Sequence, residues 1–351
     1  MPITEKLTHL ESDNYTLIKK VTGSGKVGEH EILQDQHTGA LVFRKHYLTN
    51  DVSKTQAIRE KYEKRIQNEC PYMLQCIDYS ITIKSDWCSK FYSINVYYEY
   101  PFYDLEKILK ARISARSKFL HEEIGYMFYH ILESLCYMEA KGLSDGHLQL
   151  NTVFYDIDQQ KYKLVDNFSK LSYRERCPDF YYSNNGFKIF TPEVLTALRN
   201  SDSSPLDYSK VDTYCLGVIM LTLGNLDAIY GLYDLNSFTI NQQYLSNLMK
   251  KIYDLYHDQN PLLIEIIKDL LIDNPKARPT PLQVKAKFPS YEQFVEVLRQ
   301  TQVKTEKPTF TKTGTLEMNT NDLIQSHKEL NSFRKSTFGF KPFHGTSYDN
   351  F

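Results

Sequence analysis

One short stretch of the chain gathers side chains that can move a proton or bind a metal ion. Residues 142–154 read GLSDGHLQLNTVF and follow a segment with strong helical periodicity. Asp145 carries a carboxylate, His147 an imidazole that titrates near neutral pH, and Asn151 an amide oxygen suited to a hard cation. These residue types indicate a loop for acid–base or metal chemistry, and the question is which residue supplies the acid.

A second candidate is a glycine-rich turn between two strand-like segments, with glycines at Gly23, Gly25 and Gly28. The backbone N–H groups of such a turn can cradle a phosphate, but the same spacing also suits an ordinary hairpin, which is the commoner case. The turn is not a P-loop, because Lys26 is followed by Val27 rather than by Ser or Thr. Both alternatives stay open on this motif alone.

Composition limits the classes of partner. The 351 residues are 41% hydrophobic and 24% charged with a formal net charge of −1, so we expect a large core and no net field for nucleic acid or a membrane. The six cysteines form no C-x-x-C pair, which argues against a zinc site or a disulfide framework and favours a reducing compartment. The first residues lack an apolar signal segment, and the most apolar run, CLGVIMLTLG, is too short to cross a membrane. We therefore expect a soluble intracellular protein with no nucleic-acid partner and no membrane insertion.

The periodicity of the chain changes near residue 104. Before it, β-branched and aromatic segments predict strands at residues 15–21, 29–35, 40–48, 73–83 and 91–100, with one polar helix at 53–67. After it, apolar residues at helical spacing predict helices at residues 105–112, 122–142, 211–224, 246–257, 261–272 and 291–300, and two short strands at 151–156 and 161–167. We predict an α+β protein of two lobes, with a small β-rich N-lobe at 1–98, a larger α-helical C-lobe at 99–300 and an extended tail at 301–351.

The order of these motifs resembles the protein-kinase family across about residues 14–299. After the glycine turn, in family order and with family-like gaps, come VFRK ending at Lys45, a polar helix, YYEY, YMEAKG, Asn151, KLVDN, TPEVL, SKVDTYCLGVIML and NPKARPT. The resemblance implies a two-lobed protein-kinase-like fold, and with it a set of expected site positions.

The C-terminal motifs of the family are nearly complete. By the resemblance, Glu193 of TPEVL should form a partly buried ion pair with Arg278 of NPKARPT. Asp212 should hold the loop beneath the active site by accepting backbone N–H bonds. These three residues are expected to stabilise the fold and to carry no chemistry.

The catalytic position of the family is changed. A kinase orients the acceptor hydroxyl with an aspartate five residues before the metal-binding asparagine, and that position here is Gly146. Glycine has no group that accepts a proton, so the resemblance predicts no catalytic residue. Asp145, at the family's arginine position, and His147, at its leucine position, remain the alternative bases of an unorthodox active kinase.

The metal and nucleotide positions are partly retained. Asn151 and Asp166 match the family's magnesium ligands, and the alternative is that they stabilise a turn and the backbone. Phe168 stands where the family has a glycine, which should stiffen the segment after Asp166. We predict no cofactor, with ATP and Mg²⁺ as the open alternative. The residual nucleotide-binding positions are Gly23, Gly25, Gly28, Lys45 and Asp166.

The slot for adenine is expected to be filled with protein. In the family, the residue two before the lysine is a small alanine that forms the roof of the slot; here it is Phe43. The second roof position is His30, and the floor position, Val153, is still apolar.

Lys45 keeps the position of the family's phosphate-binding lysine. Glu60 or Glu63 of the polar helix is expected to pair with it. Such a pair either supports a nucleotide or survives as a purely structural bridge, and we favour the second interpretation.

The tail at 301–351 is rich in Thr, Ser, Lys and Gly and cannot form its own core, apart from a short helical segment around 323–333. Large apolar groups on such a segment can anchor it in pockets of a partner, and the alternative is a solvated tail or one that folds back on its own domain. The anchors are Phe333, Phe338, Phe340, Phe343 and Phe351.

We therefore predict a catalytically inactive kinase-like scaffold or structural subunit, a pseudokinase that binds protein partners through its lobes and its tail within a larger assembly. The alternatives are an ATP-binding pseudokinase that acts as a nucleotide-dependent switch and an unorthodox active Ser/Thr kinase. The expected location is the cytoplasm, with attachment to the cytoskeleton or a cilium as a further hypothesis.

Overall fold

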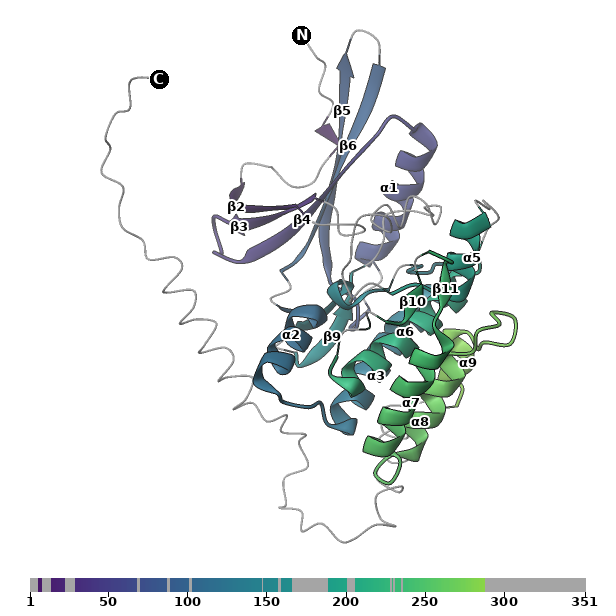
Figure 1. Ribbon diagram of the computed structural model, residues 1–351. Coiled ribbons are helices and arrows are strands. Elements are labelled where there is room, and N and C mark those ends of the chain that lie inside the picture. Colours follow the sequence, from purple (N-terminus) through teal and green to yellow (C-terminus); the bar gives the residue numbers. More distant parts are fainter. Residues whose placement is uncertain are drawn as a thin grey trace, which may run out of the picture. The chain divides into compact units, whose positions relative to one another are not determined.

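The protein is described from a computed structural model (Figure 1). The structure describes residues 6–7, 14–22, 29–67, 70–86, 89–100, 103–146, 148–156, 159–165, 189–200, 206–227, 229, 231–234 and 236–287. The chain divides into two units, Met1–Glu306 and Lys307–Phe351, and every described residue belongs to the first.

The first part of the chain forms a six-stranded antiparallel sheet in the order β1-β5-β6-β4-β3-β2. The strands are β1 (Lys6–Leu7), β2 (Tyr15–Thr22), β3 (Glu29–Asp35), β4 (Leu41–Thr49), β5 (Cys76–Asp86) and β6 (Ser89–Glu99). The long hairpin of β5 and β6 is visible in Figure 1. Side chains alternate between the two faces of a strand, so Phe43 and Lys45 lie on the same face of β4, and both are buried.

Helix α1 (Val52–Gln67) connects β4 to β5 and packs on the sheet. The prediction of a polar helix with little apolar surface is confirmed, since only a narrow stripe is buried among the α1 residues whose side chains the structure describes. That stripe has the spacing of one helical face and consists of Thr55, Ile58, Tyr62 and Arg65.

The second part of the chain is mainly helical (Figure 1). Its helices are α2 (Leu105–Ala115), α3 (His121–Ala140), α5 (Pro192–Asn200), α6 (Tyr208–Asn225), α7 (Gln242–Tyr256), α8 (Pro261–Leu270) and α9 (Pro281–Lys285). Helix α6 is buried on all sides from residue 211 to 224, as expected for the central helix of a lobe. Gly217 permits α8 to approach α6, because a Cβ at this position would lie 2.9 Å from the Cβ of Leu270.

Two small sheets complete the described elements. Strands β7 (Tyr103–Asp104), β8 (Val153–Asp156) and β9 (Lys161–Leu164) form one sheet, and β10 (Tyr233–Asp234) pairs with β11 (Thr239–Ile240). The predicted fold class is confirmed: a β-rich lobe precedes a helical lobe. The helices predicted at 291–300 and 323–333 lie outside the described residues, whereas α5, α9 and the β10–β11 hairpin were not predicted. No described helix has the length and apolarity needed to span a membrane.

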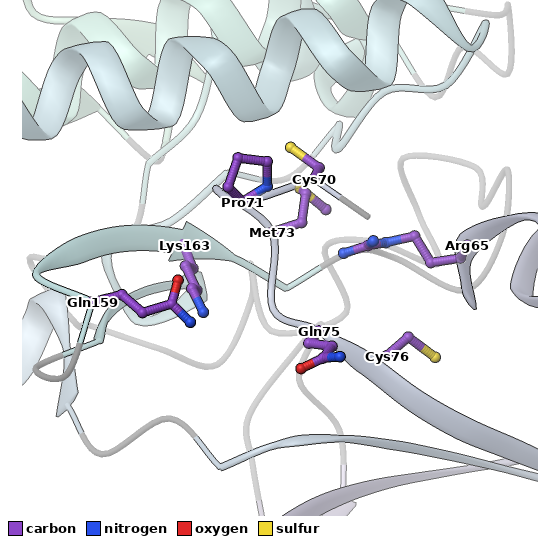
Figure 2. Close-up of a pocket in the computed structure, with 8 residues that line it drawn as sticks. All are labelled: Arg65, Cys70, Pro71, Met73, Gln75, Cys76, Gln159 and Lys163. Atoms are coloured by element: carbon purple, nitrogen blue, oxygen red, sulfur yellow. The ribbon is translucent and has the colours of Figure 1, made fainter. Parts of the chain in front are cut away.

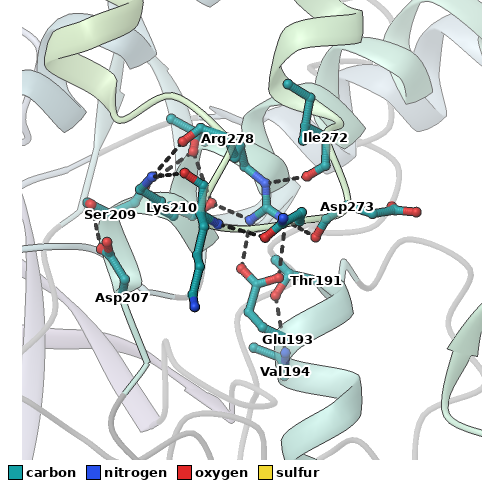
Figure 3. A network of polar contacts seen from close by, with 12 residues as sticks. Thr191, Glu193, Val194, Asp207, Ser209, Lys210, Ile272, Asp273 and Arg278 are labelled. Atoms are coloured by element: carbon teal, nitrogen blue, oxygen red, sulfur yellow. Dashed lines mark hydrogen bonds and ion pairs between the residues drawn. The ribbon is translucent and has the colours of Figure 1, made fainter.

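The predicted ion pair between Glu193 and Arg278 is confirmed (Figure 3). The guanidinium is 0% exposed and donates to both carboxylate oxygens of Glu193, at 2.6 and 3.1 Å. Its other hydrogen bonds are donated to the carbonyl oxygens of Lys210, Ile272 and Asp273. All five N–H donors of the guanidinium are therefore used, so α5 is locked to the segment before α9.

Candidate functional site

The loop that follows α3 is anchored by hydrogen bonds to a buried carboxylate. Asp212 of α6 is 1% exposed, and its oxygens accept the backbone N–H groups of Asp145 at 2.7 Å and Gly146 at 2.6 Å. This is the capping role that the resemblance predicted for Asp212, and it is confirmed. The consequence is that the loop keeps a defined backbone at the position where a kinase carries its acid.

Gly146 lacks the acidic side chain of the family, and its backbone conformation also favours glycine. Its φ is 64°, in the left-handed region that side-chain-bearing residues adopt at a cost. The residue is buried. Asp145 beside it is 1% exposed, so its carboxylate lies in the interior of the protein. His147, the other alternative base, lies outside the described residues.

The rest of the loop is built from buried neutral residues. Leu148 and Leu150 are fully enclosed. The amide of Gln149 donates to the carbonyl of Ile189 and accepts the N–H of the same residue, each at 2.8 Å. In residues 148–150, no basic side chain is present to compensate the charge of a phosphate. The hydrogen bonds between Gln149 and Ile189 could not be predicted from the sequence, because no local pattern indicates a contact between residues 40 positions apart.

Asn151 lies in a short 3₁₀ turn, Leu150–Thr152, and is half-buried. The predicted second metal position, Asp166, lies outside the described residues, as do Phe168 and the three glycines of the glycine-rich turn. Within the described ranges there is no group of three or more His, Cys, Asp or Glu side chains that could hold a metal ion. The prediction of Asn151 and Asp166 as magnesium ligands therefore stays a prediction.

The side chain of Phe43 is part of the core of the β-rich lobe. It is 3% exposed and packs in one cluster with residues of the sheet, of α1 and of the second lobe. The other buried members are Ile58, Tyr62, Leu74, Cys76, Ile81, Ile94, Val96, Tyr98, Phe154 and Val165. Phe154 follows the predicted floor residue Val153, which is itself fully buried.

Aromatic rings extend this cluster on both sides of Phe43. The ring of His30 lies 4.7 Å from that of Phe43, and the ring of Tyr98 lies 6.1 Å away on the other side. Tyr98 in turn forms a 3.0 Å hydrogen bond with the hydroxyl of Tyr62 on α1. The predicted roof residues His30 and Phe43 therefore pack in series with Tyr98. Tyr98 in turn contacts Tyr62 on the inward face of α1. Tyr62 and Tyr98 were not singled out from the sequence, although the YYEY motif includes Tyr98.

Lys45 is 2% exposed, as expected for a side chain that faces the interior. The two glutamates proposed as its partners point elsewhere: Glu60 accepts a hydrogen bond from Gln56, and Glu63 accepts one from Tyr79. Neither of the two proposed pairs occurs among the ion pairs that the structure describes, so that expectation is corrected. The reason is the rotation of α1, which turns Tyr62 rather than a glutamate inward.

A different lysine connects the lobes. Lys163 of β9 is 3% exposed, and its ammonium contacts Glu99 at the end of β6 and Asp156 at the end of β8, each at 2.7 Å. Burial alone would lower the pKa of Lys163, but hydrogen bonds with Asp156 and Glu99 raise the pKa above its usual range, so the ammonium stays charged. We call Glu99, Lys163 and Asp156 the lobe clasp. No sequence signal pointed to it.

Comparison with known proteins bears on this geometry. A family model described as protein kinase domain matches residues 15–288. Among solved structures, the chain is similar to "Crystal structure of Rad53 1-466 in complex with AMP-PNP", with 16% sequence identity and a TM-score of 0.51. The match covers 77% of this chain and 64% of that chain, so this chain spans less than two thirds of it. A search of curated proteins finds no match.

Proposed function

The chain belongs to the protein kinase family, and we propose that it is a catalytically inactive member, a pseudokinase, that serves as a binding scaffold. The observation that carries the proposal is the backbone at Gly146. The residue has no proton acceptor, its φ of 64° suits glycine, and Asp212 holds its N–H. Phosphoryl transfer to a hydroxyl needs a base that this loop holds in position.

The buried ring of Phe43 supports the same proposal. Its position two residues before Lys45 is the roof of the adenine slot by family resemblance, and the ring is packed between His30 and Tyr98. A purine at this place would have to displace a core side chain. Moving a phenyl ring out of a packed core costs about 2 kcal/mol or more of burial free energy, which a nucleotide would have to offset.

The experiment is a phosphoryl-transfer assay with γ-labelled ATP on the full chain, in Mg²⁺ and in Mn²⁺, with autophosphorylation and general protein acceptors measured together. The proposal predicts label no higher than in a sample without protein. Transfer that disappears in Asp145→Ala or His147→Ala would reject it and establish the unorthodox kinase instead. Asp258→Ala, an exposed substitution far from the loop in sequence, is the matched control.

A second candidate, a pseudokinase that binds ATP as a regulatory ligand, is favoured by the burial of Lys45 at its family position. The similar Rad53 structure was obtained with AMP-PNP, which shows that this fold holds a nucleotide in that protein. Saturable binding of Mg-ATP to the full chain that is weakened at least tenfold by Lys45→Met, while unfolding by urea is unchanged, would support this candidate.

The scaffold role includes contact with protein partners through residues 301–351. Its support is the spacing of Phe338, Phe340 and Phe343 in a segment too polar to form a core. We expect these partners in the cytoplasm, on the cytoskeleton or in a cilium. Comparison of proteins that co-purify with the full chain and with residues 1–300 tests this step. Unchanged co-purification after removal of the tail would reject it.

A further inference from the structure

The segment before α5 is attached to the loop after α3 by one side chain. Gln149 and Ile189 are both buried. The amide nitrogen of Gln149 donates to the carbonyl oxygen of Ile189, and the amide oxygen accepts the N–H of Ile189, each at 2.8 Å. A single side chain therefore binds both backbone groups of one residue. We call these two hydrogen bonds the amide clamp.

The clamp reproduces the pairing of neighbouring strands. In a hydrogen-bonded pair of antiparallel strands, a residue uses both its N–H and its C=O on the residue opposite. Here the side-chain amide of Gln149 takes the place of the second strand. A neutral amide carries an acceptor and a donor on adjacent atoms, whereas a carboxylate only accepts and an ammonium only donates. The residue type at position 149 is therefore matched to this contact.

The backbone of Gln149 is fixed in turn by Thr152. The N–H of Gln149 donates to the hydroxyl of Thr152 at 3.0 Å, and that hydroxyl donates back to the carbonyl oxygen of Gln149 at 2.9 Å. Leu148 and Leu150, on either side of Gln149, are buried. The amide is therefore held in place by its own loop. Because the hydrogen bonds of the clamp are buried, breaking them would leave polar groups without partners.

A second contact holds the next residue of the segment. The N–H of Phe190 donates to the hydroxyl of Tyr233 on β10 at 3.0 Å, and the two rings meet edge to face with centroids 5.4 Å apart. Burial raises the pKa of Tyr233, so its hydroxyl stays neutral. The hydroxyl of Thr191 then accepts the N–H of Val194 at 3.3 Å in the first turn of α5. Three consecutive residues are therefore tied to their surroundings by neutral groups.

By family resemblance, residues 189–191 lie at the end of the activation segment. Kinases commonly order this segment by phosphorylation, because the new phosphate pairs with arginine side chains. The family's arginine position is Asp145 here, and a carboxylate repels a phosphate. The anchors of residues 189–191 are instead neutral groups that the unmodified chain already carries.

The clamp is separate from the pocket drawn in Figure 2. That pocket has a volume of about 350 Å³, and its described lining includes Arg65 and Lys163 but no residue of the clamp. Arg65 donates to the carbonyl oxygen of Leu74 at 2.8 Å, and Lys163 belongs to the lobe clasp. A small molecule in this pocket would therefore not compete for the amide clamp.

We propose that the amide clamp holds residues 189–191 in one conformation whether or not the chain is phosphorylated. This end of the segment is then a constitutive part of the fold and not a switch. The start of α5 is fixed with it, because α5 follows Thr191 directly. The proposal goes beyond the scaffold role and does not depend on it, since a fixed segment is compatible with an active or an inactive loop.

The first experiment measures backbone amide exchange at Ile189 by NMR on the full chain. Phosphatase treatment removes any phosphate, and mass spectrometry verifies its removal. We expect Ile189 of the phosphate-free chain to exchange at least a hundredfold more slowly than in an unfolded chain, because both of its backbone groups are bound. Exchange at the rate of an unfolded chain, or protection that only a phosphorylated chain shows, would overturn the proposal.

Two variants distinguish the clamp from burial alone, with every rate compared with the intrinsic rate at the same pH. Gln149→Met keeps the length of the side chain but removes both polar groups, so exchange at Ile189 should be at least tenfold faster than in the native chain. Gln149→Glu should lose protection at alkaline pH and regain it as the pH falls, since the protonated acid donates and accepts as the amide does. Gln243→Met, an exposed change on α7, is the matched control and should exchange as the native chain does. Equal protection in the native chain and in Gln149→Met, or no recovery in Gln149→Glu, overturns the proposal.

A third variant tests the clamp even if the changes at position 149 prevent folding. Tyr233→Phe keeps the ring beside Phe190 but removes the hydroxyl that accepts the N–H of Phe190. Exchange should become at least tenfold faster at Phe190 and stay native-like at Ile189, which the clamp holds. Loss of protection at Ile189 in this variant would show that the clamp does not hold the segment, and the proposal would be rejected.

Discussion

The carboxylate of Asp212 accepts the backbone N–H of Gly146 at 2.6 Å, so a buried charge in α6 fixes the position where a kinase carries its acid. The same carboxylate accepts the N–H of Asp145. The loop therefore keeps a fixed backbone conformation even though Gly146 has no side chain for proton transfer.

Removal of this carboxylate should destabilise the helical lobe. Asp212→Ala leaves two buried N–H groups without their acceptor, and we expect a loss of about 3 kcal/mol in the free energy of unfolding. Urea unfolding followed by circular dichroism measures it. Asp258→Ala, whose side chain is 92% exposed, is the control and should change the free energy by less than about 0.5 kcal/mol.

Side chains at the left-handed glycines should be costly, and more so at the buried one. Gly142 has a φ of 66° with no atom within 4 Å of an added Cβ, so Gly142→Ala reports backbone strain alone, about 1 kcal/mol. Gly146→Asp has a similar φ and in addition places a carboxylate beside the buried Asp145 and Asp212. We expect it to cost more than Gly142→Ala in urea unfolding. A Gly146→Asp protein that is as stable as the native chain and transfers phosphate would contradict this.

The Glu193–Arg278 pair should behave as a buried ion pair. Arg278→Met strands the carboxylate of Glu193 together with three carbonyl groups, and we expect a loss of about 3–5 kcal/mol. The double variant Glu193→Gln with Arg278→Met should recover part of this loss, because no uncompensated charge remains. Additive losses in the double-mutant cycle would show that the pair is not coupled.

Stability should depend on pH through His130 of α3. Burial, and to a lesser extent the nearby charge of Lys161, lower the pKa of His130 to about 3, and its Nδ1 accepts the N–H of Tyr162. Because the pKa in the folded state lies below the usual 6.5, the unfolded chain takes up the proton first as pH falls. The contribution of neutral His130 is therefore complete above about pH 6.5 and is lost as pH falls toward 3.

Urea unfolding of the native chain and of His130→Asn, which keeps an acceptor for Tyr162, measures this contribution. Between pH 7 and pH 5 the native chain should lose about 2 kcal/mol more than the variant. Parallel pH curves for the two proteins would contradict the assignment to His130. His37→Asn, in an exposed turn, is the control and should follow the native curve.

The elements of the fold were predictable because their signals are local. Helices α2, α3, α6, α7 and α8 follow from apolar spacing, and α1 follows from its uninterrupted polar helical run. Asp212 and the Glu193–Arg278 pair were predictable through family resemblance, since their motifs stand in register along the chain. A short helix such as α9 carries too few residues for a periodic signal.

The contacts that define the site were harder to predict because they depend on side-chain direction. The sequence allowed Glu60 or Glu63 to face Lys45, but packing against the sheet rotates α1 so that Ile58 and Tyr62 face inward. The lobe clasp joins residues far apart in the chain, and only the folded geometry brings their charges together. The positive φ of Gly146 likewise has no signal beyond the glycine itself.

Nucleotide binding to the native chain tests the inert-scaffold claim most directly. Thermal unfolding should be recorded at increasing Mg-ATP for the native chain, for Phe43→Ala and for Ile94→Ala, which truncates another residue of the same core cluster. We predict no change in the Tm of the native chain or of Ile94→Ala at millimolar Mg-ATP, and a rise in Tm for Phe43→Ala, whose slot is opened. A saturable rise in the Tm of the native chain would contradict the claim that Phe43 closes the slot.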